Sequence, residues 1–415
     1  MTDVIVLGAG MAGVGAALAL QARGHDVVIL DRQPQFAGET SYGNAGIIQA
    51  EAVEPYAMPT DIPSLIAIAL KRTNDVEWSF EAVSSEVRNL FSYFRYSQPK
   101  NLHRIAATYS VLIRRSREDH ALYIPDAGAE ALIRKDGFNQ AWRDEGKLAM
   151  AVAKAERLNR EYGVGYEALD ADGLMAAEPA LKPGFAGAIH WTDSWCCSSP
   201  GDLTRAYGEL FLKRGGRLVE GDADTLTQEG AGWRVDSADG KISGRDVVVC
   251  LGAWSPKLLK RFGYKIPMIE KRGYHQHYRN NPLDKPLMDA SVGAVFVPMK
   301  LGMRITTGAE LTAMTATQKL RQLDEAEAGA RKVLDFGGPV ENRPWHGTRP
   351  CMPDMLPVVG KAPRHDGLWF DFGHGHQGLT LGPTTGVLIA EMMEKGATAR
   401  PRDPVLDALS PARLS

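Results

Sequence analysis

Three glycines with a characteristic spacing lie near the start of this 415-residue chain. Gly8, Gly10 and Gly13 follow directly on the apolar run Val4–Leu7, and Asp31 comes eighteen residues after Gly13. In a dinucleotide-binding turn, the three glycines permit a tight turn, close approach of the backbone to a pyrophosphate, and packing of a helix on a strand. A carboxylate at the position of Asp31 accepts hydrogen bonds from ribose hydroxyls. These residues predict a site for FAD or NAD.

The elements around these glycines have the order that such a site requires. Val4–Leu7 and Val27–Leu30 are short apolar runs, typical of parallel strands that are covered on both faces. The stretch rich in Ala and Leu that follows Gly13 and runs to Arg23 predicts a helix whose positive N-terminal end points at the phosphates. The chain therefore begins with a strand–helix–strand unit.

A second glycine loop, near the C-terminal end, has a different expected role. Gly373–Gly378 also matches G-x-G-x-x-G, and it joins the apolar strand Leu368–Phe372 to a helix over about 379–394. Too little chain follows for a second complete unit. The loop therefore predicts a site for the negative charge that reduced flavin carries at N1 and at the C2 oxygen, with a purely structural turn as the alternative. With one complete unit, the nucleotide is either NAD(P) itself or FAD that exchanges electrons with a docking partner.

The charge balance and the few cysteines exclude several classes of protein. The chain has 48 basic and 50 acidic residues, and this net charge of -2 gives no electrostatic case for nucleic acid. Its four cysteines form no C-x-x-C pair, which favours a reducing, cytoplasmic environment and argues against an iron–sulfur cluster. His374 and His376 are not part of an H-E-x-x-H pattern, so no metal site is expected.

One apolar segment bears on membrane contact. No signal peptide is expected, because a buried strand already begins at Val4. The segment Ile62–Leu70 is too short to span a bilayer, and Lys71 and Arg72 follow it. Two interpretations stay open: an amphipathic helix packed on its own core, or a peripheral segment on the inner face of the cytoplasmic membrane.

The order of the expected elements predicts an α/β protein with two domains. Separated apolar strands predict a Rossmann-like domain for the dinucleotide, assembled from several segments, and the chain between them predicts an inserted α+β domain. The expected division gives the Rossmann-like domain residues 1–50, 185–260 and 345–415, and the inserted domain residues 51–184 and 261–344.

Four stretches carry a family resemblance: the N-terminal unit, the loop Glu39–Gly46, the motif W-H-G-T-R-P within Trp345–Gly360, and Gly373–Pro383. Together they resemble the D-amino-acid oxidase and dehydrogenase superfamily, and most closely its bacterial FAD-dependent D-amino-acid dehydrogenases, over essentially the whole chain. The sequence departs from the family pattern at Tyr42-Gly43, where many relatives have Phe-Ala.

The resemblance implies an FAD enzyme, with the cofactor held non-covalently. The implied reaction is oxidative deamination of D-amino acids to 2-oxo acids and ammonia, with hydride transfer from Cα to flavin N5 and electrons passed to a quinone or another carrier. Oxidation of a secondary amine acid such as 4-hydroxy-D-proline, D-proline or sarcosine stays open. The second glycine loop disfavours an NAD-dependent dehydrogenase. A non-catalytic flavoprotein is a third alternative.

Arg349 matches the superfamily position that binds the substrate carboxylate, and its planar guanidinium suits this role. No general base is required, because a neutral amine releases its hydride directly. Tyr274 is the second expected substrate contact, but strand alternation over Tyr274–Tyr278 does not say which face looks toward the flavin. The expected catalytic residues are Arg349, Tyr274 and His376, and the expected substrate-binding residues are Arg349, Tyr274, Tyr56 and His346. The expected cofactor contacts are Gly8, Gly10, Met11, Ala12, Gly13, Asp31, Arg32, Thr40, Ser41, Asn44, Ala45, Gly46, Ile47, Gly252, Trp254, Gly375, His376, Gln377, Gly378, Leu379 and Thr380.

Overall fold

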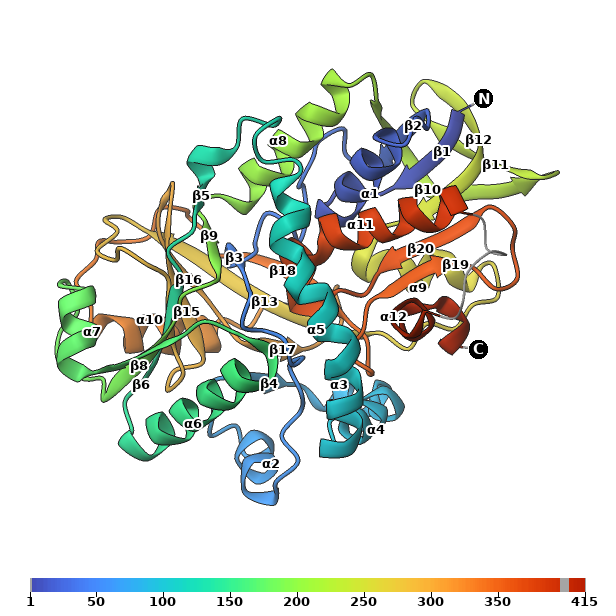
Figure 1. Cartoon of the computed structure of the whole chain (residues 1–415). Helices are drawn as coiled ribbons and strands as arrows, with labels where there is room; N and C mark the ends of the chain where they lie inside the picture. The colour runs from blue at the N-terminus through green and yellow to red at the C-terminus, as the bar shows by residue number, and fades with distance from the viewer. Residues whose placement is uncertain (1, 396–402, 415) are drawn as a thin grey trace.

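A parallel sheet at the N-terminal end of the protein carries the predicted dinucleotide unit (Figure 1). The computed structural model describes residues 2–395 and 403–414. Five strands run parallel in the order β10, β2, β1, β12 and β20, while β19 pairs antiparallel at one edge and β11 joins the extended ends of β10 and β12. The strands are β1 Thr2–Leu7, β2 Val27–Asp31, β10 Arg217–Glu229, β11 Gly232–Ser237, β12 Gly240–Val249, β19 Val358–Lys361 and β20 Leu368–Phe372.

Two glycine-rich helices pack against each other beside this sheet. They are α1, Met11–Gln21, and α11, Gly378–Lys395. A Cβ atom on Gly15 would lie 2.7 Å from the carbonyl oxygen of Gly382, and one on Gly386 would lie 2.4 Å from the carbonyl carbon of Gly15. The glycines therefore let the two backbones approach directly, which aligns the N-terminal ends of both helices. Two further helices pack next to them, α5 Pro99–Ala121 and α8 Pro200–Lys213.

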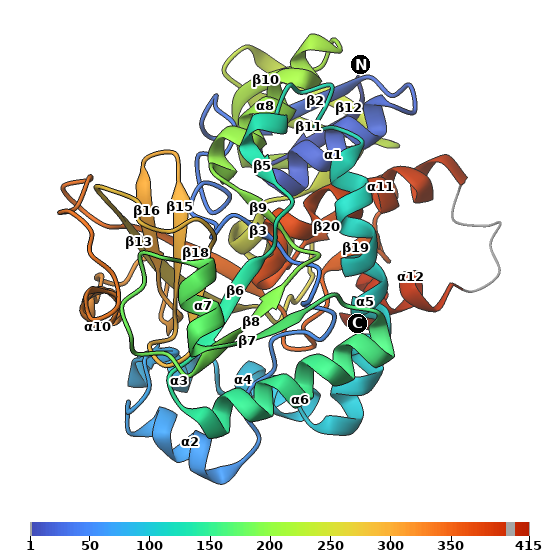
Figure 2. The same cartoon turned by 60° about the vertical axis from the view of Figure 1, so that its left-hand side comes forward.

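A second, mixed sheet of ten strands lies beside the parallel sheet (Figures 1 and 2). Its strands are β4 Val76–Trp78, β17 Ala309–Leu311, β13 Ile269–Tyr278, β16 Gly302–Thr306, β15 Ala294–Met299, β14 Leu287–Asp289, β6 Phe138–Trp142, β8 Gly187–Trp191, β7 Glu167–Asp170 and β18 Trp345–Cys351. The helices α6 Glu145–Tyr162, α7 Ala171–Ala177 and α10 Arg321–Arg331 accompany it. A small sheet joins β3 Ile47–Ile48, β9 Trp195–Cys197 and β5 Ile133–Arg134.

The architecture is the expected α/β arrangement of a Rossmann-like domain with an α+β domain. Sheet membership places two of the expected domain boundaries later in the chain. β8 pairs with β6 and β7, and β18 pairs with β13, so both strands lie in the mixed sheet although they follow residues 185 and 345. The sheet to which a strand belongs is decided by pairing with strands far away in the sequence, and the local pattern of apolar residues does not show it.

Three short helices, α2 Ile62–Ala69, α3 Phe80–Ser85 and α4 Val87–Tyr96, lie together at the end of the molecule away from the N-terminus (Figures 1 and 2). Neither α2 nor α3 contains a fully buried residue. None of the helices within residues 2–395 and 403–414 is long and apolar enough to cross a bilayer. The remaining elements are α9 Ser255–Lys260, α12 Pro404–Leu409 and the 3-10 turns Glu130–Leu132, Gly252–Trp254, Gly375–Gln377 and Pro411–Leu414.

Candidate active site

The first glycine turn has the geometry that requires glycine. Gly8 has a φ of +109°, and a Cβ atom there would lie 2.7 Å from the carbonyl oxygen of Cys250. A Cβ atom on Gly13 would lie 1.9 Å from the carbonyl oxygen of Gly8. Only glycine therefore allows α1 to begin directly behind β1. The backbone N–H of Met11, at the start of this helix, donates to Ser41 Oγ over 2.9 Å, which joins the turn to the loop Glu39–Gly46.

Asp31 is fixed at the end of β2 as a ribose-binding carboxylate requires. Its Oδ2 accepts from the Ala9 N–H at 2.8 Å, and its Oδ1 accepts from the Gln33 N–H at 3.0 Å. The next residue, Arg32, lies over the indole ring of Trp254 at 4.5 Å. These contacts use only part of the lone pairs of the carboxylate, so Asp31 keeps acceptor sites for a ligand.

The loop Glu39–Gly46 connects the glycine turn with the mixed sheet. Thr40 Oγ1 donates to the carbonyl of Thr348 at 3.1 Å, and Asn44 Oδ1 accepts from the Gly46 N–H at 2.8 Å. A Cβ atom on Gly43 would lie 1.8 Å from the ring of Trp345, so this loop and this indole are in direct contact. Trp345 is a cavity residue that sequence reasoning missed, although it begins the motif that pointed to Arg349.

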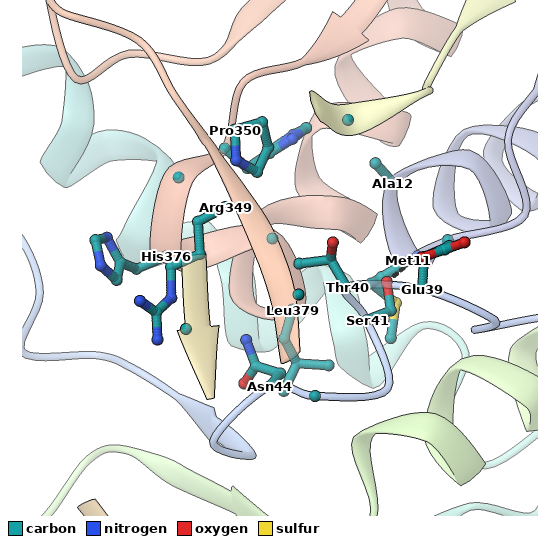
Figure 3. Close-up of a pocket in the computed structure, with 18 of the residues that line it drawn as sticks. Met11, Ala12, Glu39, Thr40, Ser41, Asn44, Arg349, Pro350, His376 and Leu379 are labelled. Atoms are coloured by element: carbon teal, nitrogen blue, oxygen red, sulfur yellow. Dashed lines mark hydrogen bonds between the residues drawn. The ribbon is translucent and has the colours of Figure 1, made fainter. Parts of the chain in front are cut away.

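One cavity of about 570 Å³ connects the glycine turn to Arg349. Figure 3 shows Met11, Ala12 and Glu39 at one end and Arg349 with His376 at the other, with Thr40 and Asn44 between them. The predicted cofactor contacts that line it are Gly8, Gly10, Met11, Ala12, Asp31, Arg32, Thr40, Ser41, Asn44, Ala45, Ile47, Gly252, Trp254, Gly375, His376, Gly378 and Leu379.

Four predicted cofactor contacts lie behind the wall of the cavity. Gly13 packs against the turn, and a Cβ atom on Gly46 would lie 2.4 Å from the carbonyl oxygen of Cys197. Gln377 donates to the side chain of Gln49, and Thr380 Oγ1 donates to the carbonyl of Ile47 at 3.4 Å. These four residues pack against, or hydrogen-bond to, residues that line the cavity. Gln49 itself lines the cavity and was not predicted.

Arg349 is held by two backbone carbonyls. Its Nη1 donates to the carbonyl oxygen of Gly308 at 2.7 Å, and its Nη2 donates to that of Thr307 at 3.1 Å. A Cβ atom on Gly273 would lie 2.4 Å from Nη2, so the guanidinium lies across β13 where that strand has no side chain. Three of the five N–H groups of the guanidinium remain for a ligand. The carbonyls are neutral acceptors, so they do not neutralise its positive charge. Arg349 can therefore still bind a carboxylate.

Tyr274 and His346 face away from Arg349. The antiparallel register pairs Tyr274 with His346 and Lys271 with Arg349. Lys271 comes three residues before Tyr274 and Arg349 three residues after His346, and an odd offset along a strand places side chains on opposite faces. Tyr274 borders the cavity, but its hydroxyl donates to Glu310 Oε2 at 2.5 Å. The rings of Tyr274 and His346 are 6.1 Å apart, and His346 does not line the cavity. The opposite face of β13 carries His275, whose ring stacks on Trp345. The sequence alone did not show which of the two faces would meet this side of the cavity.

Tyr56 and His376 lie together at the Arg349 end. Their ring centroids are 5.1 Å apart, and the hydroxyl of Tyr56 lies 2.9 Å from Gln49 Nε2. Burial, with the nearby charges of Arg349 and Lys271, holds the pKa of His376 well below its ordinary value. Loss of hydration by the hydroxyl, with the nearby carboxylate of Glu51, raises the pKa of Tyr56 to about 12. Both side chains are therefore uncharged at neutral pH.

The residues present fit a flavin dinucleotide at the level of chemistry. A backbone turn and helix N-terminus face one end, a fixed carboxylate lies beside them, and the second glycine loop lines the far end near a cation. This arrangement would place a bound flavin and an anionic ligand in one cavity. Tyr56 and His376 add no charge beside Arg349.

Comparison with known proteins agrees with this geometry. The sequence matches the family described as FAD dependent oxidoreductase, DAO, over residues 3–392. The D-amino acid dehydrogenase of Cereibacter sphaeroides is 30% identical over 421 residues, which cover 94% of this chain and 91% of that protein. The D-amino acid dehydrogenase of Chromohalobacter salexigens is 28% identical, with 94% and 95% covered.

A solved structure shares the fold along the whole length. The glycine oxidase from Geobacillus kaustophilus matches with a TM-score of 0.75 and 21% identity, covering 100% of this chain and 98% of that one. The predicted family and fold are confirmed, and this chain belongs to the DAO family of FAD-dependent oxidoreductases.

Proposed function

We propose that the protein is an FAD-dependent dehydrogenase of D-amino acids. A D-amino acid and water give a 2-oxo acid, ammonia and two reducing equivalents, which pass to a quinone or another carrier. Bound FAD would supply the hydride acceptor for this reaction. The single observation that carries the proposal is the guanidinium of Arg349, fixed by the carbonyls of Gly308 and Thr307 inside the cavity that also contains the glycine turn.

The role of Arg349 is to bind and orient the substrate carboxylate. A bidentate guanidinium–carboxylate pair fixes both position and direction, so Cα is held at one place in the cavity. Holding the reacting atoms about 3–3.5 Å apart provides a large share of the rate acceleration in reactions of this kind. Because two backbone carbonyls hold the guanidinium, little side-chain freedom is lost when a substrate binds.

The neutral side chains near Arg349 shape the substrate pocket. Tyr56 and His376 are uncharged at neutral pH, and Tyr56 is tied to Gln49. They add no charge beside Arg349. Such surroundings suit a substrate that reacts as the neutral amine. In this proposal the non-covalent FAD is held by the turn at Gly8–Gly13, by Asp31 and by the loop Glu39–Gly46.

An anaerobic reduction experiment tests the proposal. The reconstituted protein is mixed without oxygen with each enantiomer of the common amino acids, with secondary amine acids such as D-proline, 4-hydroxy-D-proline and sarcosine, and with glycine. Bleaching of the flavin band by D-amino acids, with release of ammonia and a 2-oxo acid, is expected. Reduction only by secondary amines would move the assignment to that substrate class. A flavin that no amine reduces would contradict it.

We further propose that the enzyme contacts a membrane surface where a quinone is reduced. The side chains of Ile62 and Ile66 on α2 and of Leu70 directly after it are 71%, 51% and 55% exposed. Phe80 on α3 and Phe91 on α4 are 81% and 62% exposed. Exposed apolar side chains gathered at one end of a protein are typical of interaction surfaces. Basic residues directly after α2 and on α4 favour anionic lipid. These are Lys71, Arg72, Arg88 and Arg95.

Vesicle flotation tests this membrane proposal. Anionic phospholipid vesicles are expected to carry the holoenzyme with them, and Ile66→Asp combined with Phe80→Asp is expected to abolish the binding. Leu301→Asp is the matched control, because Leu301 is 53% exposed in another part of the surface. Equal flotation of the double variant and the control, or no flotation of the unchanged enzyme, would contradict the membrane contact. Reduction of a quinone analogue by the enzyme in solution is measured separately.

A further inference from the structure

A buried arginine on the mixed sheet reaches the loop that borders the cofactor cavity. Arg304, in β16, is 3% exposed. Its Nη1 donates to the carbonyls of Tyr42 and Asn44, at 3.2 and 2.5 Å. Its Nε donates to His277 Nε2 at 3.0 Å. All three partners are uncharged, and among the residues that the structure describes no carboxylate oxygen lies within 4.0 Å of its guanidinium.

The contacts of Arg304 cross from one domain to the other. Its strand belongs to the mixed sheet, whereas Tyr42 and Asn44 belong to the loop Glu39–Gly46 behind the glycine turn. Within that loop Gly43, Asn44 and Ala45 line the cavity. The loop has little regular structure of its own, so the guanidinium fixes the direction of two of its carbonyls. Their amide groups are thereby oriented at the cavity wall.

Two residues hold Arg304 in this position. Because His277 Nε2 accepts from Arg304, the proton of the imidazole is assigned to Nδ1, which faces Glu341. Glu341 also accepts from the backbone N–H of His277 at 3.0 Å. Its carboxylate is therefore the counter-charge of Arg304, one imidazole ring away. His275, His277 and Glu341 converge as a metal site would, but Arg304 occupies the lone pair that His277 would offer.

We propose that Arg304, oriented by His277 and Glu341, is a positioning residue that clamps the loop Glu39–Gly46 and supplies buried positive charge behind the loop that borders the FAD cavity. The inference rests on FAD as the cofactor of this cavity. A charge in a low-dielectric interior acts over longer distances than one in water, and its separation from Glu341 leaves part of its field uncompensated. Reduced flavin is more negative than oxidised flavin, so the charge favours the reduced form.

Two substitutions separate the clamp from the charge. Arg304→Lys keeps a positive charge but loses the fork that reaches Tyr42, Asn44 and His277 together. Arg304→Met loses both. The readouts are the dissociation constant of FAD for the apoprotein and the flavin midpoint potential from a dithionite titration. Neither measurement needs an amino-acid substrate, so the outcome is independent of the substrate assignment.

The expected results differ between the two variants. For Arg304→Met, the FAD dissociation constant rises at least about tenfold, in line with the loss of hydrogen bonds from a charged group, and the midpoint potential falls. For Arg304→Lys, the dissociation constant also rises, but the midpoint potential stays closer to that of the unchanged protein. Unchanged affinity and potential in Arg304→Met would overturn the proposal. Equal potentials in the two variants would overturn the part that concerns charge.

A matched control and a rescue variant complete the test. Arg143→Met removes a partly buried arginine, whose contacts go to Asp289 and to the carbonyl of Gly329 rather than to the loop. It is expected to lower the melting temperature without changing FAD affinity or potential. His277→Leu is expected to weaken FAD binding, and His277→Gln, whose Oε1 can accept from Arg304 Nε, to restore it. Wild-type affinity in His277→Leu would overturn the orienting role.

Discussion

At the scale of single residues, the proposed function depends most on Arg349. Arg349→Ala removes the proposed partner of the substrate carboxylate and leaves the Gly308 and Thr307 carbonyls without their donor. Loss of one member of a buried, hydrogen-bonded charge pair costs about 2–4 kcal/mol, or roughly 30- to 900-fold in kcat/KM. Steady-state kinetics on a D-amino acid are expected to show this loss mainly as a higher KM, with FAD still bound.

Arg349→Lys is the informative comparison. A lysine keeps the charge but offers no planar fork, so it is expected to recover only a part of the lost kcat/KM. An uncharged substrate analogue such as an amino-acid amide should be nearly insensitive to Arg349→Ala. If the amide and the free acid lost activity to the same extent, Arg349 would be acting on the structure of the cavity rather than on the carboxylate.

The positions of individual residues on the cavity were predictable where a motif fixes them. Gly8, Gly10 and Asp31 lie on the cavity because their motif describes backbone geometry that the chain forms locally. Arg349 also lies on it, and its position was expected from the family resemblance. The direction of Tyr274 was not predictable. Alternation in a strand defines two faces, but only the pairing with β18 shows which one meets Trp345. Gln49 lies on the cavity through a tertiary contact that no local spacing reports.

At the scale of elements, strand β13 shows how the sheet admits the substrate anchor. Gly273 leaves the space that the guanidinium of Arg349 fills, at 2.4 Å from an added Cβ atom. Gly273→Ala is expected to displace the guanidinium and to raise KM by roughly 10- to 100-fold, since misplacement by about 1 Å has effects of this size. FAD affinity should not change, and titration of the apoprotein with FAD checks this. A variant with unchanged KM would show that the anchor adapts elsewhere.

The contact among helices α5, α8 and α11 is expected to make the free energy of unfolding of the protein depend on pH. His120 in α5 is fully buried, and its ring nitrogens lie 2.9 Å from Tyr207 Oη in α8 and 2.9 Å from the carbonyl of Leu379 in α11. Burial lowers the pKa of His120 from 6.5 to about 4. Between pH 4 and pH 6.5, His120 binds a proton in the unfolded chain but not in the folded protein. Stability is therefore complete above pH 6.5 and falls as the pH drops toward 4.

The size of this effect can be measured with one variant. Between pH 7.5 and pH 5, His120 alone is expected to remove about 2 kcal/mol from the free energy of unfolding. His120→Gln keeps an amide that can donate to the Leu379 carbonyl but does not titrate, so its urea unfolding should lose correspondingly less over the same interval. Identical pH dependence in the two proteins would show that His120 is protonated in the folded state.

The elements themselves were largely predictable, and their partners were not. The strands β1, β2 and β20 and the helix α11 lie close to the expected ranges, because each has a run of apolar residues with clear ends. The positions of β8 and β18 in the mixed sheet follow from pairing over long sequence separations. The helix α2 also forms as expected, but none of its residues is fully buried, which its composition did not indicate.

At the scale of the whole molecule, the cavity joins segments that are far apart in the chain, so FAD should stabilise the protein as a unit. A ligand at 100 times its dissociation constant adds about 2.7 kcal/mol to the free energy of unfolding. Gly10→Val should abolish this gain. Gly10 has a φ of −79° and a ψ of 178°, which valine tolerates, so the chain still folds. Its side chain would nevertheless start 3.2 Å from Ser41 Oγ and fill the approach of the pyrophosphate.

Urea unfolding with and without FAD checks this prediction, with Gly338→Ala as the control. An added Cβ atom on Gly338 meets no atom within 4 Å, so this variant should gain the same stability from FAD as the unchanged protein. A folded, colourless Gly10→Val protein that FAD does not stabilise would show that the turn holds the cofactor. If FAD stabilised Gly10→Val by the full amount, the nucleotide would have to bind elsewhere, and the Arg349 end of the cavity would lose its redox partner.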